Sequence, residues 1–138
     1  MGDDHNLQRF IQAQESVLQV VETELAAGRK RSHWMWFIFP QLKGLGHSMM
    51  ANHYGIRDLD EAQAYLQHPV LGERLRHHTE LVLATENRSA EEIFGYPDYL
   101  KFRSCMTLFS QVAEEDSPFQ RALERFYGGE PDSRSLHP

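Results

Sequence analysis

The stretch LQRFIQAQESVLQVVETELAAG, residues 7–28, decides the fold class of this chain. Its apolar residues recur three and four positions apart, the spacing that places side chains on one face of an α-helix. This face consists of Leu7, Phe10, Ile11, Val17, Leu18, Val21 and Leu25, with Gln14 as a polar member. Gly28 then stands where a glycine commonly ends a helix. The pattern predicts one amphipathic helix of about five turns.

Further helix starts follow along the chain. Residues that favour N-cap positions stand before apolar segments at Asp58, Ser89, Asp98 and Ser117, and Ser48 begins a segment that leads to Tyr54. We find no run of alternating apolar and polar residues bounded by turns, so strands are expected to be minor or absent. The sequence predicts one all-α domain over residues 1–138, with about six to eight helices. The polar tail, residues 129–138, is expected to be flexible.

Composition excludes several classes of protein. The net charge of −6 disfavours bulk nucleic-acid binding, which normally requires a basic surface. Cys105 is the only cysteine, so no intramolecular disulfide can form, and no zinc-binding motif is present. We therefore expect neither a metal nor an organic cofactor. The polar N-terminus does not resemble a signal peptide, and no apolar run approaches a membrane span, which indicates a cytoplasmic protein with no membrane partner.

The segment GRKRSHWMWFIFPQLKGLG, residues 28–46, concentrates cations and aromatic residues. Two interpretations of its basic part are open. The cations either complement the dipole of the preceding helix or form an anion site. In the second case Ser32 caps a short helix over 34–38, whose N–H groups face the same anion as Lys30 and Arg31.

The aromatic part of this segment allows a ligand pocket. One helical turn cannot bury all of its sides, so some rings should line a groove, and Trp34 and Trp36 are the candidate stacking residues. His33 and Gln41 bracket the rings with polar groups that could orient a ligand. The alternative is that the rings are core residues and that His33 is bound to a backbone carbonyl.

A second polar cluster lies in DYLKFRSCMT, residues 98–107. On a helix, Asp98 and Lys101 share one side with Ser104 beside them, and Arg103 lies on the next side. These residues form either a surface ion pair with small packing residues, or a second wall of the pocket in which Lys101 meets a phosphate or carboxylate. Cys105 is expected to pack as a small hydrophobic residue. No complete catalytic set is recognisable.

Long motifs of the chain resemble one family. They are LQRFIQAQ, GRKRSHWMWFIFPQLKGLGHS, YLQHPVLGERL, EEIFGYPDYLKFRSCMTLF and FYGGEPD, and in this order they resemble the DUF1810 family, also termed Rv1873-like. The resemblance implies a compact all-α fold and no assigned activity. Cys105 departs from the serine that is usual there in the family. A fainter similarity to the YbiA-like proteins suggests, by analogy, ADP-ribose or other N-glycosidic chemistry.

Two functional hypotheses follow. In the first, a small phosphorylated or nucleotide-like ligand stacks on Trp34 or Trp36, with phosphate contacts from Lys30, Arg31 and Lys101. That site extends to Ser32, Gln41, Arg103 and Ser104, and His33, Asp98 and Lys101 are its candidate catalytic residues. In the second, exposed aromatic and basic residues form a protein-interaction or self-association surface. The sequence does not name the substrate, and it leaves open whether the protein is an enzyme.

Overall fold

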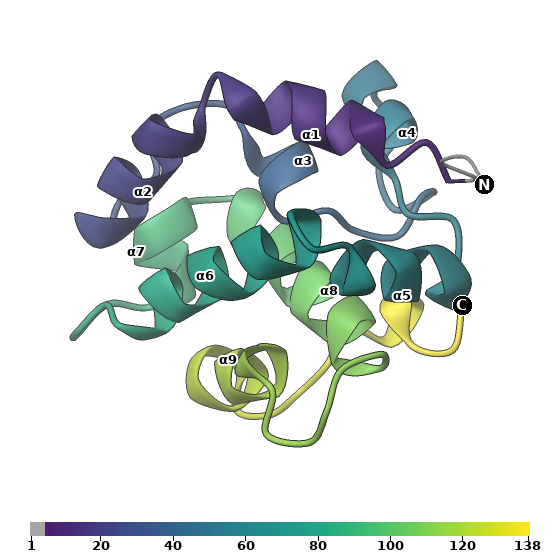
Figure 1. Cartoon of the computed structure of the whole chain (residues 1–138). Helices are drawn as coiled ribbons and strands as arrows, with labels where there is room; N and C mark the ends of the chain where they lie inside the picture. Colours follow the sequence, from purple (N-terminus) through teal and green to yellow (C-terminus); the bar gives the residue numbers. More distant parts are fainter. Residues whose placement is uncertain (1–4) are drawn as a thin grey trace.

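The computed structural model describes residues 5–138, and within them the chain is helical (Figure 1). The elements are α1 Gln8–Glu15, α2 Leu18–Ala26, α3 Met35–Ile38, α4 Met49–Tyr54, α5 Leu59–Gln67, α6 Leu71–Leu83, α7 Ala90–Phe94, α8 Asp98–Ser110, α9 Pro118–Tyr127 and the 3₁₀ turn η1 Ser133–Ser135. Across this part of the chain the one β-type feature is an isolated parallel bridge between Leu42 and Ile56. The predicted all-α class is confirmed.

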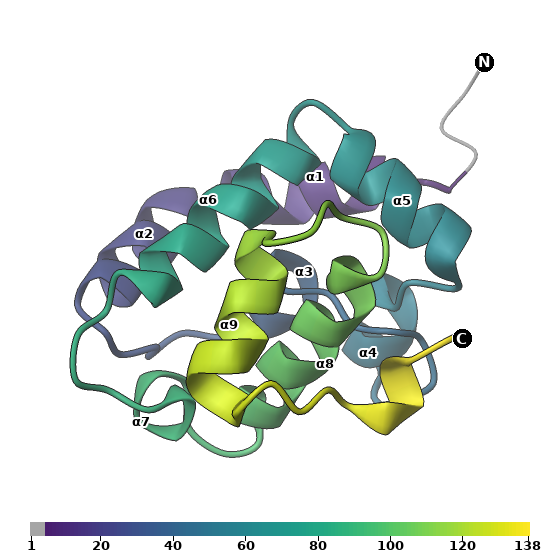
Figure 2. The ribbon, with the colours of Figure 1, turned by 90° about the horizontal axis from the view of Figure 1, so that it is seen from below.

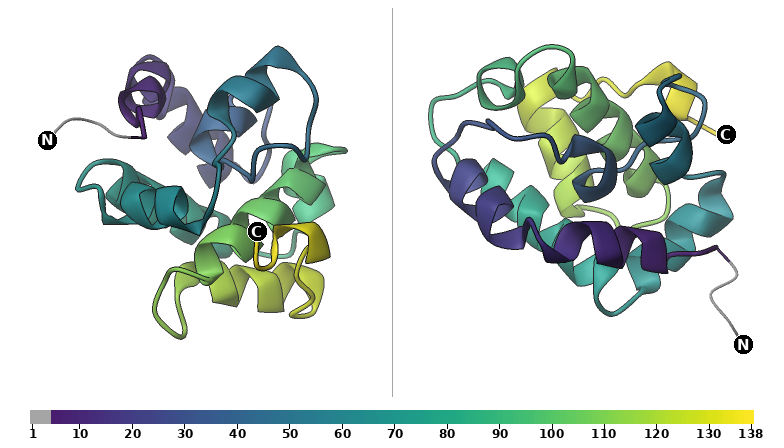
Figure 3. Two further views of the ribbon diagram at one scale, coloured as in Figure 1. Left: turned by 90° about the vertical axis from the view of Figure 1, so that its right-hand side faces the viewer. Right: turned by 90° about the horizontal axis from the view of Figure 1, so that it is seen from above.

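The segment 7–28 forms two helices where the sequence predicted one. The α-helical pattern is interrupted after α1, where the Val17 N–H donates to the Gln14 carbonyl at 3.0 Å, and it resumes when the Val21 N–H donates to the Val17 carbonyl at 2.9 Å. Viewed from above, α1 and α2 follow one another along one edge of the molecule (Figure 3). Because α1 packs on α3 while α2 packs on α6, the break directs each apolar stripe to its own neighbour. This division raises the helix number above the predicted six to eight.

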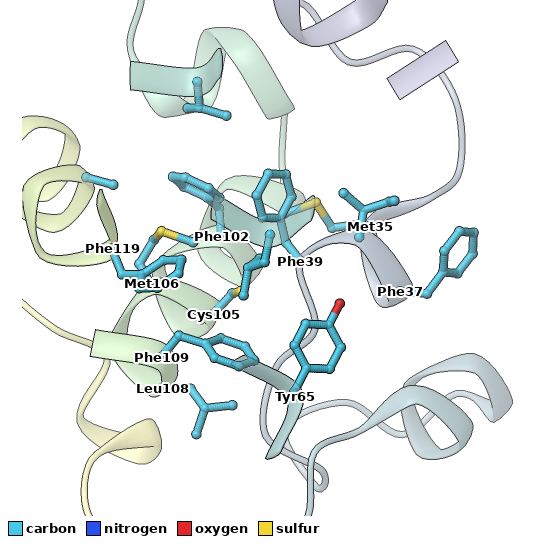
Figure 4. Packing of buried hydrophobic residues seen from close by; sticks show 14 of the residues in the cluster. Met35, Phe37, Phe39, Tyr65, Phe102, Cys105, Met106, Leu108, Phe109 and Phe119 are labelled. Carbon is cyan, nitrogen blue, oxygen red and sulfur yellow. The ribbon is translucent and has the colours of Figure 1, made fainter. Parts of the chain in front are cut away.

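Helix α8 occupies the centre of the core. It packs against α9, α7 and α5, and α9 also lies on α6 (Figure 2). Its residues Phe102, Cys105 and Phe109 have no exposed surface. The Phe39 ring reaches Phe102 edge to face at a centroid distance of 5.0 Å, so the segment after α3 packs directly into the core (Figure 4). No helix in the described part of the chain combines the length and apolarity needed to cross a membrane.

Side-chain caps begin four of the helices in the described residues. The side chains of Ser48, Asp58, Ser89 and Ser117 each accept a hydrogen bond from the backbone N–H three residues later, as predicted. The prediction that Asp98 caps α8 is wrong, because Asp98 is the first residue of the helix and its carboxylate is engaged in ion pairs.

One glycine fixes the close approach of two helices. A Cβ atom on Gly72, in the first turn of α6, would lie 1.9 Å from the carbonyl oxygen of Leu66 in α5. No side chain fits at that distance, so glycine is required for the tight turn between α5 and α6.

Candidate ligand-binding site

The two segments that the sequence singled out meet at an ion cluster. Lys30 follows α2, and its Nζ lies 2.8 Å from one carboxylate oxygen of Asp98, at the start of α8. The Nζ of Lys101, one turn further along α8, lies 3.4 Å from the other oxygen. The three side chains are recessed, with exposed fractions of 8 % for Lys30, 16 % for Asp98 and 25 % for Lys101. Two ammonium groups on one carboxylate leave a formal charge of +1.

Trp36 completes the cluster. Lys101 Nζ lies 5.0 Å from the centroid of the Trp36 ring, which is within the range of a cation–π contact. Trp36 is half-buried, and so one part of its surface remains accessible. Trp34 is fully buried, and Lys30 Nζ lies 5.0 Å from its ring. This corrects the prediction that Trp34 could stack on a ligand, because the ring belongs to the core.

The basic loop folds around a carboxylate of the chain itself. Glu24, which is buried, accepts hydrogen bonds from the backbone N–H groups of Arg31 and Ser32, from Ser32 Oγ at 2.6 Å and from the Trp34 indole at 2.9 Å. Burial raises the pKa of Glu24, but these hydrogen bonds together outweigh it and lower the pKa to about 2. Donors that were predicted to hold an external anion therefore bind Glu24.

This loop corrects a second prediction. Ser32 does not cap the following helix, because its hydroxyl donates to Glu24 and α3 is a single turn that begins at Met35. The Arg31 side chain is exposed and lines a separate hollow of about 520 Å³ along α2.

His33 and Gln41 are not tied to the ion cluster. The His33 side chain is exposed and makes no hydrogen bond, ion pair or ring contact within residues 5–138. Gln41 is half-buried, and its backbone carbonyl accepts a hydrogen bond from the Ile56 N–H at 2.9 Å. Their roles as catalytic and ligand-binding residues stay predictions.

A sequence profile described as "Protein of unknown function (DUF1810)" matches residues 4–137. The chain belongs to the DUF1810 family. A search of curated proteins finds no match to this DUF1810 chain. Among solved structures, the crystal structure of the conserved hypothetical protein Rv1873 from Mycobacterium tuberculosis is similar, with 53 % identity, 97 % of this chain and 96 % of that chain covered, and a TM-score of 0.95. This match covers the whole fold, and the matched protein is described only as a conserved hypothetical protein.

Two predicted pocket residues of the DUF1810 chain bind the C-terminal segment. Arg103 donates to the carbonyls of Glu130 and Pro131 at 2.9 and 2.8 Å, and Ser104 Oγ donates to Asp132 at 2.8 Å. Figure 2 shows this segment passing from α9 to η1 beside α8. The polar groups predicted to face a ligand thus hold residues 130–132 in place. The expected flexibility of the tail stays a prediction.

The remaining chemistry in this region is limited. Cys105, next to Ser104, is fully buried, and burial raises the pKa of its thiol well above the usual value, so the thiol packs as a hydrophobic group. Within residues 5–138 no group of three or more His, Cys, Asp or Glu side chains is arranged to hold a metal ion.

Sequence reasoning missed a polar hollow elsewhere in the molecule. It has a volume of about 450 Å³ and lies where α1 begins, α4 ends and α5 begins. It is lined by His5, Asn6, Arg9, Lys43, Asn52, His53, Gly55, Arg57 and Glu61. These residues come from two stretches of the chain, 5–9 and 43–61, and form no local motif, so only the folded structure brings them together.

Proposed function

We propose that this DUF1810 protein binds a small phosphorylated or nucleotide-like molecule over Lys30, Trp36, Asp98 and Lys101. The observation that carries the proposal is the placement of two lysines on a single carboxylate beside an aromatic ring. One lysine is enough to neutralise the Asp98 carboxylate. The second lysine leaves a positive charge on a recessed, partly accessible surface.

The roles of the residues follow from their positions. Trp36 offers a ring on which a base can stack, and Lys101, already against that ring, is placed to bind a phosphate oxygen. Lys30 is the more buried lysine and fixes the Asp98 carboxylate. Nucleotides and ADP-ribose combine a flat ring with phosphates, so these are the ligands to test first. If the bound ligand is also hydrolysed or modified, Asp98 is the group placed to transfer a proton, with His33 as the second candidate.

A thermal-shift screen tests the proposal. The purified protein is heated with AMP, ADP-ribose and NAD. A ligand that binds only the folded state stabilises it by about 2.7 kcal/mol at a hundredfold excess over its Kd. The shift should disappear in Lys101→Gln and Trp36→Leu and persist in Arg134→Gln, which removes a cation from a different surface. Absence of any shift, or an equal shift in all variants, would contradict the proposal.

One observation favours a second function at the same place. Tyr96 and Leu100 flank Asp98 and are 77 % and 40 % exposed, which is unusual for large apolar side chains and typical of a protein contact. In this alternative the cluster is the centre of a partner or self-association surface. Light scattering at high protein concentration distinguishes the two functions. If the surface mediates self-association, the wild type should form a dimer and Tyr96→Ser should be monomeric. If the protein binds a ligand as a monomer, the substitution should not change its mass.

A further inference from the structure

Arg9 lies at the base of the polar hollow at the junction of α1, α4 and α5, where hydrogen bonds hold its side chain in place. All five N–H groups of the Arg9 guanidinium donate hydrogen bonds, with lengths from 2.6 to 3.2 Å. The acceptors are the backbone carbonyls of His5, Asn6, His53 and Gly55 and the carboxylate of Glu61. Arg9 therefore has no donor left for a ligand, and its role is to join residues 5–9 to residues 53–61.

The buried carboxylate under the hollow is also saturated. Glu61 has no exposed surface, and one of its oxygens accepts from Arg9 at 2.9 Å. The other accepts from the Arg57 backbone N–H at 2.9 Å and lies 3.5 Å from Arg57 Nε. The single negative charge of Glu61 can neutralise only one guanidinium. Arg9 lies closer to it, at 2.9 Å against 3.5 Å for Arg57, and is therefore the group that it neutralises.

The rim of the hollow carries charge that this carboxylate does not neutralise. Three cations, Arg9, Arg57 and Lys43, against the single carboxylate of Glu61 give a formal charge of +2 in a chain whose net charge is −6. The Arg57 side chain is 57 % exposed. Within residues 5–138, neither the Lys43 ammonium nor the Asn52 side-chain amide makes a hydrogen bond or an ion pair. These groups remain available to an external acceptor.

We infer that this hollow is a second binding site, which takes the phosphate group of a small phosphate monoester. A phosphate monoester carries a charge of about −1.5 to −2 at pH 7, which matches the formal charge of the hollow. Arg57 Nε lies 3.5 Å from Glu61 and Nη2 lies 3.2 Å from His5 Nδ1, so the remaining Nη hydrogens are the ones that can bind phosphate oxygens. Lys43 adds a point charge and Asn52 a neutral donor. The volume of about 450 Å³ exceeds what a phosphate alone requires and lies in the range of small-molecule sites.

This site is independent of the proposed function. It shares no residue with the cluster of Lys30, Trp36, Asp98 and Lys101, and it contains no tryptophan on which a base could stack. The hollow therefore favours a sugar phosphate or a similar small organic phosphate over a nucleotide.

The test is an NMR titration of ¹⁵N-labelled full-length protein with ribose 5-phosphate, with ribose and inorganic phosphate as comparison probes. We expect saturable shifts of backbone amides at Lys43, at 52–55 and at Arg57. Ribose should cause none, and ribose 5-phosphate should bind more tightly than inorganic phosphate because the hollow also accommodates the sugar. Lys43→Gln and Arg57→Gln should each weaken binding at least tenfold, with the rest of the spectrum unchanged.

Two variants serve as controls. Arg134→Gln removes a similarly exposed arginine, 67 % exposed and 3.7 Å from Asp132, and Lys101→Gln removes the lysine of the proposed function. Both should bind ribose 5-phosphate as the wild type does. Equal affinity for inorganic phosphate and ribose 5-phosphate would contradict a site for an organic phosphate. Shifts confined to the start of α8, or unchanged affinity in Lys43→Gln and Arg57→Gln, would overturn the site itself.

Discussion

Lys30 and Asp98 lie far apart in the chain and form a 2.8 Å ion pair in which the lysine side chain is only 8 % exposed. This pair joins the loop after α2 to the first turn of α8, and the Lys30 N–H reinforces the junction by donating to the Ile93 carbonyl of α7 at 2.7 Å. The candidate ligand surface is built on this junction, because Asp98 also binds Lys101, which lies against Trp36.

Breaking this pair should destabilise the fold. Asp98→Asn leaves Lys30 with little solvent and no carboxylate, so we expect the free energy of unfolding to fall by about 2–4 kcal/mol. Urea denaturation measures the change. The matched control is Glu80→Gln, which breaks the exposed 2.7 Å pair with Arg121 and should cost less than about 1 kcal/mol. Equal losses in the two variants would show that the Lys30–Asp98 pair is an ordinary surface pair.

Glu24 should make stability depend on acid pH. Although burial raises its pKa, the hydrogen bonds from the loop lower it to about 2, below its unfolded value near 4.5. The contribution of Glu24 is therefore complete above pH 4.5 and lost as the pH falls from 4.5 toward 2. We expect the denaturation midpoint of the wild type to drop more steeply across this range than that of Glu24→Gln. Parallel curves for the two proteins would contradict the assigned hydrogen bonding.

His78 should make the stability of the fold depend on pH in a higher range than Glu24 does. It is 2 % exposed in α6, and burial, with a smaller effect of neighbouring His77, lowers its pKa to about 4 from 6.5. The unfolded chain then binds the extra proton first, so stability is complete above pH 6.5 and falls as the pH decreases toward 4. This part of the pH dependence should be absent in His78→Gln and intact in His47→Gln, an exposed histidine. Hydrogen-exchange or urea measurements between pH 4 and 7 would show it.

Gly72 should tolerate no side chain. The Cβ of an alanine would overlap the Leu66 carbonyl oxygen, so Gly72→Ala must displace α5 from α6. We expect a loss of about 1–3 kcal/mol in the free energy of unfolding, the usual cost of overpacking. Gln63→Ala, at an exposed position of α5, should leave stability nearly unchanged. A stable Gly72→Ala protein would mean that the two helices can separate at little cost.

Local signals in the sequence predicted much of the fold. The capping box of Ser89 and Glu92 and the helix end before Gly28 depend on residues within one turn, and both formed as predicted. The break after Ser16 did not follow from local pattern, because it depends on α1 and α2 having different packing partners. The helical class could thus be read from periodicity, and the bend could not.

The candidate site was predictable only in part. Sequence reasoning placed Lys30 and Lys101 in the same site, and the structure brings both to Asp98. It could not separate Trp34 from Trp36, since either ring could have filled the core. The polar hollow lined by Arg57 was missed altogether, because its residues share no motif and come together only in the folded chain, in part through the hydrogen bonds of Arg9 to His53 and Gly55.

The two tryptophans allow the most direct test of ligand binding at the ion cluster. In a ¹⁵N-labelled sample titrated with ADP-ribose, the indole N–H signal of half-buried Trp36 should shift and saturate. The signal of Trp34, which is buried and bound to Glu24 at 2.9 Å, should stay in place as an internal control. Lys101→Gln should abolish the shift of Trp36. If the Trp36 signal does not move at saturating ADP-ribose while the amides around Arg57 do, the proposed site at the ion cluster is contradicted. The polar hollow would then be the ligand site.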